Sequence, residues 1–428
     1  HCWGMASIGG PSHDGCFSEK GGFAYKASAI VQDVIFKASN ALCDQIAYEG
    51  DADDTFLTVF NPLGMARSEV VRAGMADFAP CGTRMFWTNH ADGTPCHSAS
   101  VLDGRWPNYA PQWMLDNEFD LVDVDTGKVI PHQVMVITDP LTPQPWAAER
   151  VGIAVVGGAA QRDIVFIDEL PALGYKTYKC VKTDTAFATS EPAQDNIIEN
   201  AFYRVTFDLS AGKVLSILDK AMDRELLDAD APHGFGDLVV RTSLDLKEFH
   251  DTVVSGSIVE AGPLYTTARF KGFTHSLPQW TKDVTIYHTI KRIDLNVRML
   301  KDTTPLVETY MAFPFKVDAP QVRFEGANSV IEPTVDQLPG SNTDYYAAHH
   351  WADVSDGAGG VTWAPIDTHM VEFGGLWGGS MSAAHHGATG PEYGHDWLKP
   401  GEITKGHIYS FIAYNNFRTN FINVRAGD

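Results

Sequence analysis

The sequence is short of basic residues, and this limits the partners it can have. It holds 32 Lys and Arg against 54 Asp and Glu, which gives a formal net charge of -22 at pH 7. Nucleic acids and anionic membranes are bound through basic patches, so we expect neither as a partner. An acidic surface is compatible with a neutral substrate such as a sugar, which it neither attracts nor repels.

Sequence signals of several other protein classes are also missing. No apolar run approaches the ~18 residues of a membrane span, and the start has no segment of the signal-peptide type. The glycine-rich runs have neither GxGxxG nor P-loop spacing, so they predict no phosphate site. No GxSxG motif indicates a serine nucleophile.

Cysteine is scarce and irregularly spaced. No CxxC motif is present, which excludes zinc-ribbon and thioredoxin-type readings. The even number permits disulfides without requiring them. We expect free, buried thiols in a reducing compartment, which favours the cytoplasm. The six cysteines are Cys2, Cys16, Cys43, Cys81, Cys96 and Cys180.

What is present indicates a globular protein of two or three domains, since the chain has 428 residues of which 44% are hydrophobic. Residues 1–21 are rich in Gly and Ser, which predicts an irregular loop. From about Gly22, apolar residues recur at helical spacing and predict an amphipathic helix that ends near Gly50. We expect the partner of its apolar face to lie in sequence beyond this chain. The start at His1, without an initiator Met, also suggests a piece of a longer protein.

After Asp51–Asp54 the chain turns to β-structure. Ala201–Asp208 and Lys213–Asp219 flank Gly212 and predict a hairpin. The many further β-prone runs, separated by hairpin-length gaps, predict antiparallel sheets packed in two layers. These runs are Thr55–Asn61, Ser68–Ala73, Phe119–Val124, Val129–Val136, Ile164–Ile167, Lys176–Cys180, Asp237–Arg241, Val253–Glu260, Leu264–Phe270, Lys282–Ile290, Ile293–Leu300, Val307–Phe313 and Gln321–Phe324.

Several phrases, in their order along the chain, resemble the C-terminal β-domains of family 38 glycoside hydrolases, the α-mannosidases. In the last of them Phe417 stands where the family commonly has Trp. The phrases are VFNPLGMARSEVV from Val59, LPALGY from Leu170, IENAFYRV from Ile198, TIYHTIKRIDLNVRM from Thr285, VETYMAFPF from Val307, HHWADVSDGAGGVTWAPID from His349 and YSFIAYNNFRTNF from Tyr409.

The resemblance implies a mainly β fold of antiparallel two-sheet sandwiches with one N-terminal amphipathic helix. Residues 1–52 would be a loop and a helix left from a connecting helical bundle. Residues 53–195 would form a small β-sandwich, and residues 196–428 a large β-supersandwich of the galactose-mutarotase type.

The same resemblance implies a retaining, Zn²⁺-dependent glycosidase that acts on a mannoside or a related glycan. In this family the nucleophile, the acid and most metal ligands sit in an N-terminal catalytic barrel, which this sequence lacks. We therefore predict no catalytic residue in this chain. Its partner would be the missing barrel, which it braces and walls. Zinc would belong to the whole protein, and this chain alone would hold no cofactor.

His1 is the one predicted metal ligand. His1-Cys2-Trp3-Gly4 resembles what would remain of the family's "EHTWG" phrase, in which a histidine after the barrel supplies a late zinc ligand, although Cys2 departs from that pattern. A stable zinc site needs about three or four donors. In this chain alone we therefore expect His1 to be an ordinary terminal residue.

Two functions of other classes remain open. One is a stand-alone carbohydrate-binding module. The other is a lyase or epimerase on a mutarotase-like sandwich, which requires a cleft that gathers His, Tyr, Arg or carboxylate groups with perturbed pKa values. The first candidates for such a cleft are His349, His350, His395 and Asp396. Against it, neighbouring strand residues point to opposite faces, so we expect His349 and His350 to be surface or structural residues.

The tryptophans and one further histidine pair have similar alternatives. Aromatic faces pack well against the C–H groups of sugars, but sandwich cores also need large side chains. We expect core or interface packing for the tryptophans and a surface position for His385 and His386. The tryptophans in question are Trp351, Trp363, Trp377 and Trp397.

Overall fold

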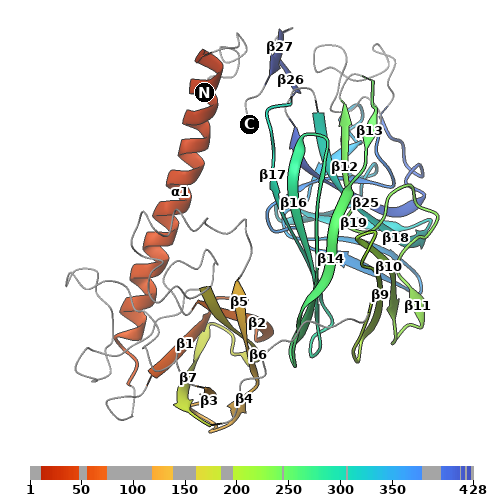
Figure 1. Cartoon of the computed structure of the whole chain (residues 1–428). Helices are drawn as coiled ribbons and strands as arrows, with labels where there is room; N and C mark the ends of the chain where they lie inside the picture. Colours follow the sequence, from red (N-terminus) through yellow and green to blue (C-terminus); the bar gives the residue numbers. More distant parts are fainter. Residues whose placement is uncertain are drawn as a thin grey trace.

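The computed structural model describes residues 11–47, 55–74, 118–137, 161–184, 196–242, 245–304, 307–377, 397–414, 416–419 and 422–425. In this part of the chain one helix precedes a series of antiparallel strands (Figure 1). The predicted fold class, mainly β with a helix near the N-terminus, is confirmed. Within the same ranges no helix has the length and apolar character needed to cross a membrane.

The helix α1 spans Pro11–Cys43, so it both begins and ends earlier than the sequence pattern predicts. The prediction of an irregular loop was wrong for residues 11–21, and residues 1–10 lie outside the described ranges. Pro11 stands in the first turn, where its missing N–H is no loss. Gly21 and Gly22 each cost about 1 kcal/mol relative to alanine, which is too little to interrupt a helix this long.

The large apolar side chains of α1 that the structure describes face solvent. The helix ends where Gln45 and Ile46 donate backbone hydrogen bonds to the carbonyls of Leu42 and Cys43. Upstream of this turn, the large apolar residues are at least half exposed, between 50% and 80%; they are Phe23, Tyr25, Ile30, Val31, Val34, Ile35 and Leu42. The expected partner for this face therefore remains a prediction. Cys43 is a buried free thiol, as is Cys180, which confirms the expectation for these two cysteines.

Two small sheets follow the helix and pack against each other. A two-residue strand, β4, is separated from β5 by Pro131, which has no N–H for a sheet ladder; the predicted single strand Val129–Val136 is therefore two strands. One sheet has the order β1 (Thr55–Asn61), β7 (Gly174–Lys182), β3 (Phe119–Asp123), β4 (Val129–Ile130), and the other β2 (Arg67–Gly74), β6 (Gln161–Leu170), β5 (His132–Ile137). Their shared core includes Leu57, Val71, Phe119, Leu121, Ile164, Phe166 and Tyr178.

The larger part of the chain holds five further antiparallel sheets. Their orders are β11 (Arg224–Glu225), β10 (Lys213–Asp219), β9 (Tyr203–Asp208), β8 (Ile197–Glu199); β13 (Glu248–Phe249), β12 (Leu238–Thr242), β18 (Val307–Asp318), β25 (Lys405–Tyr414), β24 (Met370–Phe373), β21 (Tyr345–Ala347); β14 (Thr252–Ala261), β15 (Tyr265–Thr274), β16 (Leu277–Tyr287), β17 (Ile293–Leu300); β20 (Ser329–Ile331), β19 (Gln321–Gly326), β22 (Ala352–Asp356), β23 (Gly359–Trp363); and β26 (Asn416–Thr419), β27 (Ile422–Arg425).

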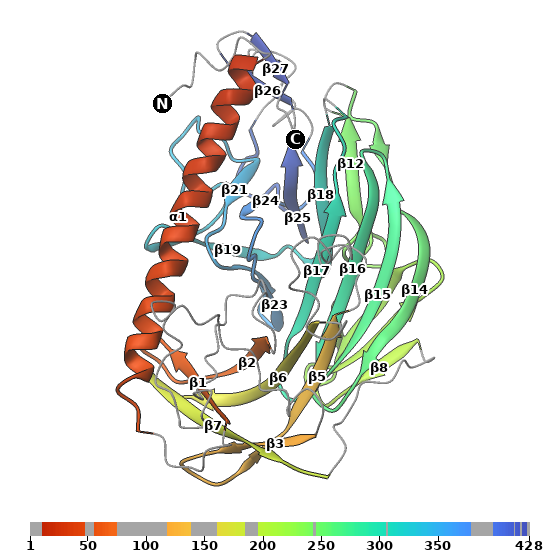
Figure 2. The ribbon, with the colours of Figure 1, turned by 60° about the vertical axis from the view of Figure 1, so that its left-hand side comes forward.

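The six-stranded sheet and the β14–β17 sheet share the main core (Figure 2). Apolar side chains at alternate positions of each strand meet between the two layers, as the period of two in a strand requires. From the six-stranded sheet come Leu238, Val240, Phe313, Val371, Phe373 and Ile408, and from the other Ala268, Phe270, Trp280, Val284 and Ile286. Trp363 also joins this core, which confirms core packing for that tryptophan.

The predicted hairpin is present. Strands β9 and β10 pair antiparallel, and the Asp208 carboxylate closes the turn by accepting hydrogen bonds from the N–H groups of Ser210 and Ala211. Gly212 has a φ of +65°, and a Cβ there would lie 2.5 Å from a methyl group of Val253. Glycine is therefore required at this turn both for its conformation and for its lack of a side chain.

The small sandwich touches the β14–β17 sheet directly. The Arg292 guanidinium lies 2.8 Å from the Glu69 carboxylate, and the N–H of Leu264 donates a 3.4 Å hydrogen bond to Gln133. Gly262 lies against the same glutamine. A Cβ on this glycine would be 2.2 Å from the side-chain oxygen of Gln133. These contacts join the two regions predicted as 53–195 and 196–428, whose boundaries remain a prediction.

Gly272 on β15 provides a test of this packing. A Cβ at this position would lie 2.2 Å from the carbonyl oxygen of Thr252 and 2.4 Å from the ring of Trp280. We expect Gly272→Ala to lower the free energy of unfolding by about 1–3 kcal/mol, as overpacking in a close-packed core does. Gly357→Ala is the control, because nothing lies within 4 Å of its Cβ position. The measurement is urea unfolding followed by tryptophan fluorescence, and equal midpoints for the two variants would contradict the packing.

Candidate functional site

Polar side chains gather on the face of the six-stranded sheet that points away from the main core. In β12, Val240 enters the core while Arg241 projects to the opposite side, and β18 and β24 place Tyr310 and Glu372 on that side in the same way. Strand alternation forces this arrangement. We call this side the polar face; its members are Arg241, Glu308, Tyr310, Glu372, His407 and Tyr409.

A buried network occupies the centre of the polar face. Nε and an Nη of Arg241 donate to one oxygen of Glu308 at 3.0 and 2.8 Å. The hydroxyl of Tyr310 lies 3.2 Å from that same oxygen and 3.0 Å from the Glu372 carboxyl. All four side chains are almost completely buried. The network thus holds one permanent cation beside two acids.

Hydrogen-bond geometry and burial together favour a proton on one of these acids. The Tyr310 hydroxyl carries a single hydrogen, yet it lies within hydrogen-bond distance of both carboxyl groups. Burial raises the pKa of Glu372 to about 8, and burial beside the two acids raises that of Tyr310 well above its ordinary value. A protonated Glu372 that donates to Tyr310, which in turn donates to Glu308, satisfies every contact and leaves one cation facing one anion.

Glu372 also fixes the chain segment that follows β24. Its second oxygen accepts a 2.8 Å hydrogen bond from the N–H of Trp377, and the indole of Trp377 donates to the carbonyl of Phe373. The intervening Gly374 has a φ of +83°, which favours glycine. The buried network therefore sets the position of residues 374–377.

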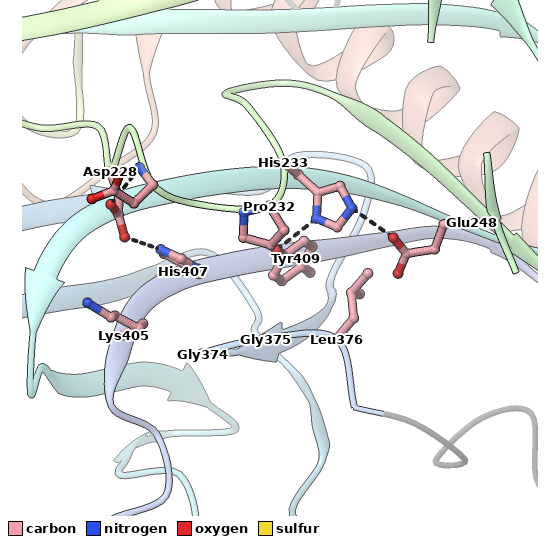
Figure 3. A pocket seen from close by; sticks show the side chains of 11 residues that line it. Asp228, Pro232, His233, Glu248, Gly374, Gly375, Leu376, Lys405, His407 and Tyr409 are labelled. Atoms are coloured by element: carbon pink, nitrogen blue, oxygen red, sulfur yellow. Dashed lines mark hydrogen bonds and ion pairs between the residues drawn. The ribbon is translucent and has the colours of Figure 1, made fainter. Parts of the chain in front are cut away.

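Gly374, Gly375 and Leu376 form one wall of a pocket of about 480 Å³ (Figure 3). Small-molecule sites commonly have volumes of this size, roughly 300–1,000 Å³. The loop between β11 and β12 and the first residues of β25 supply most of the other walls. The lining residues are Asp228, Asp230, Pro232, His233, Glu248, Gly374, Gly375, Leu376, Lys405, His407 and Tyr409.

His233 joins two other side chains at one side of the pocket. Its Nδ1 atom lies 3.0 Å from the Tyr409 hydroxyl and its Nε2 atom 3.2 Å from the Glu248 carboxylate. Burial lowers the pKa of His233, against the opposing influence of Glu248, so the ring is neutral at pH 7. In a neutral ring, Nε2–H donates to Glu248 and Nδ1 accepts from Tyr409.

Asp228 and His407 form a second pair in the pocket. Nε2 of His407 lies 2.9 Å from the carboxylate of Asp228. Burial acts to raise the pKa of Asp228, but the hydrogen bonds from His407 and from the N–H of Asp230 lower it on balance. The carboxylate therefore accepts from His407. Figure 3 shows this pair on the side of the pocket opposite Glu248.

A comparison with known protein families covers part of the chain that forms this pocket. Residues 198–365 match the sequence model of the glycosyl hydrolases family 38 C-terminal domain. This part of the chain is a family 38 C-terminal domain. No curated protein sequence matches the chain. Among solved structures, an alpha-mannosidase from Enterococcus faecalis V583 is similar over 84% of this chain, with 11% identity and a TM-score of 0.43. The match covers 43% of that protein, so the chain spans less than half its length.

The family 38 domain does not bring the predicted site residues together. His349 and His350 lie on the surface, where Nδ1 of His350 is 3.0 Å from the Glu325 carboxylate. This confirms surface positions for the pair. The remaining predicted residues lie outside the described ranges; they are His1, His385, His386, His395 and Asp396.

The zinc prediction finds no donor set in the described ranges. There, no group of three or more His, Cys, Asp and Glu side chains is arranged to hold a metal ion. The described residues by themselves thus do not fit a zinc site. Zinc, with His1 as a ligand, stays a prediction for the whole protein.

The pocket residues of the family 38 domain and the strand that follows it were missed in the sequence. A signal was present: β25 reads KGHIYSFIAY, in which Lys405, His407 and Tyr409 alternate with the core residue Ile408. Charged residues inside otherwise apolar strands, such as Arg241 in LVVRT and Glu372 in MVEF, are a second signal. Both patterns indicate a polar environment on the second face of a buried sheet.

The Glu372 proton predicts a specific dependence of stability on pH. Between pH 4.5 and about 8 the folded protein keeps a proton that the unfolded chain has released. The free energy of unfolding therefore falls as the pH rises through this window, with a slope approaching about 1.4 kcal/mol per pH unit. Glu372→Gln, which cannot ionise, should lose this component and gain stability relative to wild type toward pH 8.

The measurement is a set of urea unfolding curves at pH 5, 6, 7 and 8. Glu332→Gln, at an exposed carboxylate, is the matched control and should follow the wild-type profile. Parallel profiles for Glu372→Gln and wild type would show that Glu372 is ionised in the folded protein.

Proposed function

We propose that the protein to which this chain belongs hydrolyses α-mannosidic bonds with retention of configuration. In this proposal the catalytic carboxylates and most of the zinc ligands lie outside the chain, which braces and walls the catalytic barrel. The observation that carries the proposal is the family 38 C-terminal domain over residues 198–365.

A bracing role is supported by the contacts between the two sandwiches. Arg292 forms ion pairs with both Glu69 and Asp294, so its guanidinium links the small sandwich to β17. Tyr265 and Tyr287, at adjoining ends of β15 and β16, pack into the core of the small sandwich. A support that is continuous across two sandwiches suits a role in holding a further domain in place.

The two alternative functions are affected differently by the pocket. The first candidates for the lyase or epimerase were His349, His350, His395 and Asp396; the first two lie on the surface, and the other two lie outside the described ranges. A carbohydrate-binding role is supported by the pocket, which gathers acceptor groups and apolar side chains in one place. That possibility is compatible with the proposed hydrolysis and is developed below.

The test compares the whole protein with the 428-residue chain on an aryl α-mannoside. We expect turnover by the whole protein, with loss of activity on treatment with a chelator and recovery on addition of Zn²⁺. The purified 428-residue chain should release no product, with or without Zn²⁺. The anomer formed first, observed by NMR, should keep the α configuration of the substrate.

Two outcomes would contradict the proposal. Turnover by the 428-residue chain, abolished by a chelator, would place the catalytic groups inside it. A whole protein that leaves aryl α-mannosides intact in the presence of Zn²⁺ would refute the proposed reaction. An aryl β-mannoside serves as the control substrate in both measurements.

A further inference from the structure

We propose that the pocket lined by the loop between β11 and β12, by β13, by residues 374–376 and by β25 is a binding site for a neutral sugar ring. Glu248 and His407 would accept hydrogen bonds from hydroxyl groups of the sugar. The proposal concerns binding alone and does not depend on the proposed hydrolysis.

Some hydrogen-bond acceptors of the pocket have no partner, and they favour a ligand that carries hydrogen-bond donors. One carboxylate oxygen of Glu248 accepts a hydrogen bond from His233. Its other oxygen has no partner among the described residues. Nε2 of His407 donates a hydrogen bond to Asp228. Its Nδ1 has no hydrogen-bond partner within the same part of the chain. Since Nε2 carries the hydrogen, Nδ1 of a neutral His407 is an acceptor. Acceptors on two sides require a ligand with several donors, such as the hydroxyl groups of a sugar.

The charges around the pocket disfavour an anionic ligand. Asp228, Asp230 and Glu248 line it together with a single cation, Lys405. Lys405 is itself 2.6 Å from the carboxylate of Asp318. A phosphate or a sugar acid would place a further negative charge among these carboxylates without a free cation to meet it, which costs affinity.

The size and the apolar part of the pocket suit one sugar ring. His407 and Tyr409 are two residues apart on β25, and so about 7 Å apart along the strand. Leu376 and Pro232 contribute apolar surface to the lining, against which the C–H face of a sugar can pack. The backbone of Gly374 and Gly375 leaves room because these residues have no side chain.

The supporting shell holds this arrangement in advance of binding. His233 is fixed on both ring nitrogens, and residues 374–377 are fixed by Glu372. Sites whose groups are already oriented lose less entropy on binding. Glu372 is thus a positioning residue for the pocket wall and not itself a ligand-binding residue.

The experiment is calorimetric titration of the 428-residue chain with D-mannose, D-glucose and D-galactose, each tested separately. D-mannuronate serves as an anionic probe and D-mannosamine as a cationic one. We expect saturable binding of at least one neutral sugar with a Kd in the millimolar range. Mannuronate should bind at least about tenfold more weakly, which corresponds to about 1.4 kcal/mol.

Two variants locate the binding. Glu248→Ala removes an acceptor at a half-exposed side chain and should weaken binding at least tenfold. Leu376→Trp keeps every acceptor but fills the pocket, and should abolish binding. Glu332→Ala, on the surface away from the lining, should bind as wild type does. Thermal unfolding of each variant shows whether the fold is intact, and Leu376→Trp provides the test if Glu248→Ala is unfolded.

Three results would overturn the proposal. These are the absence of saturable binding by any neutral sugar, unchanged binding in both folded pocket variants, and tighter binding of mannuronate or mannosamine than of mannose. None of these measurements involves turnover. Failure of this proposal is therefore distinct from failure of the proposed hydrolysis.

Discussion

The ion pair between Arg241 and Glu308 is the interaction on which the polar face of the six-stranded sheet depends. The two side chains are 3% and 0% exposed, so neither charge can be compensated by water. Removing one partner of such a pair leaves an uncompensated buried charge and costs about 3–5 kcal/mol. Burial is the main reason that the pKa of Glu372, the second acid in the network, is raised, and the neighbouring Glu308 anion adds to this effect against the opposing influence of Arg241.

A short series of hydrogen bonds connects this ion pair to the wall of the pocket. Tyr310 links Glu308 to Glu372, and Glu372 holds the N–H of Trp377. The first step lies within β18, the second crosses β25 from β18 to β24, and the third reaches the segment directly after β24, so little freedom remains at the pocket wall. The pocket is thus shaped by a network that lies beside it and does not line it.

Much of the fold could be predicted because alternation and turn residues are local signals. Lys213–Asp219 and Ile293–Leu300 were predicted with the bounds that β10 and β17 have, since each alternates between two faces and is bounded by turn residues. The start of α1 was missed because glycine and serine were read as loop signals. Their helix propensities differ from those of good helix formers by about 1 kcal/mol or less, which a long helix tolerates.

The pocket could not be predicted because it depends on the order of strands in the sheet. Strand β13 follows β12 in the sequence, but β25 reaches the sheet from more than 150 residues further along and lies beyond β18. Glu248 lies in the two-residue strand β13, which hydrophobic periodicity does not predict, and periodicity does not show which strands are neighbours. The family resemblance did not supply the missing contact, since His407 and Tyr409 lie after residue 365, where the family match ends.

The contact between the two sandwiches has a consequence for where the molecule can be divided. Leu264, Tyr265 and Tyr287 belong to the larger unit by sequence but are buried in the core of the smaller one. Cutting the chain between the two units would expose these apolar side chains on the larger piece. It would leave an open hydrophobic cavity in the smaller piece. The two units are separate along the sequence, whereas in the folded molecule they share one hydrophobic core.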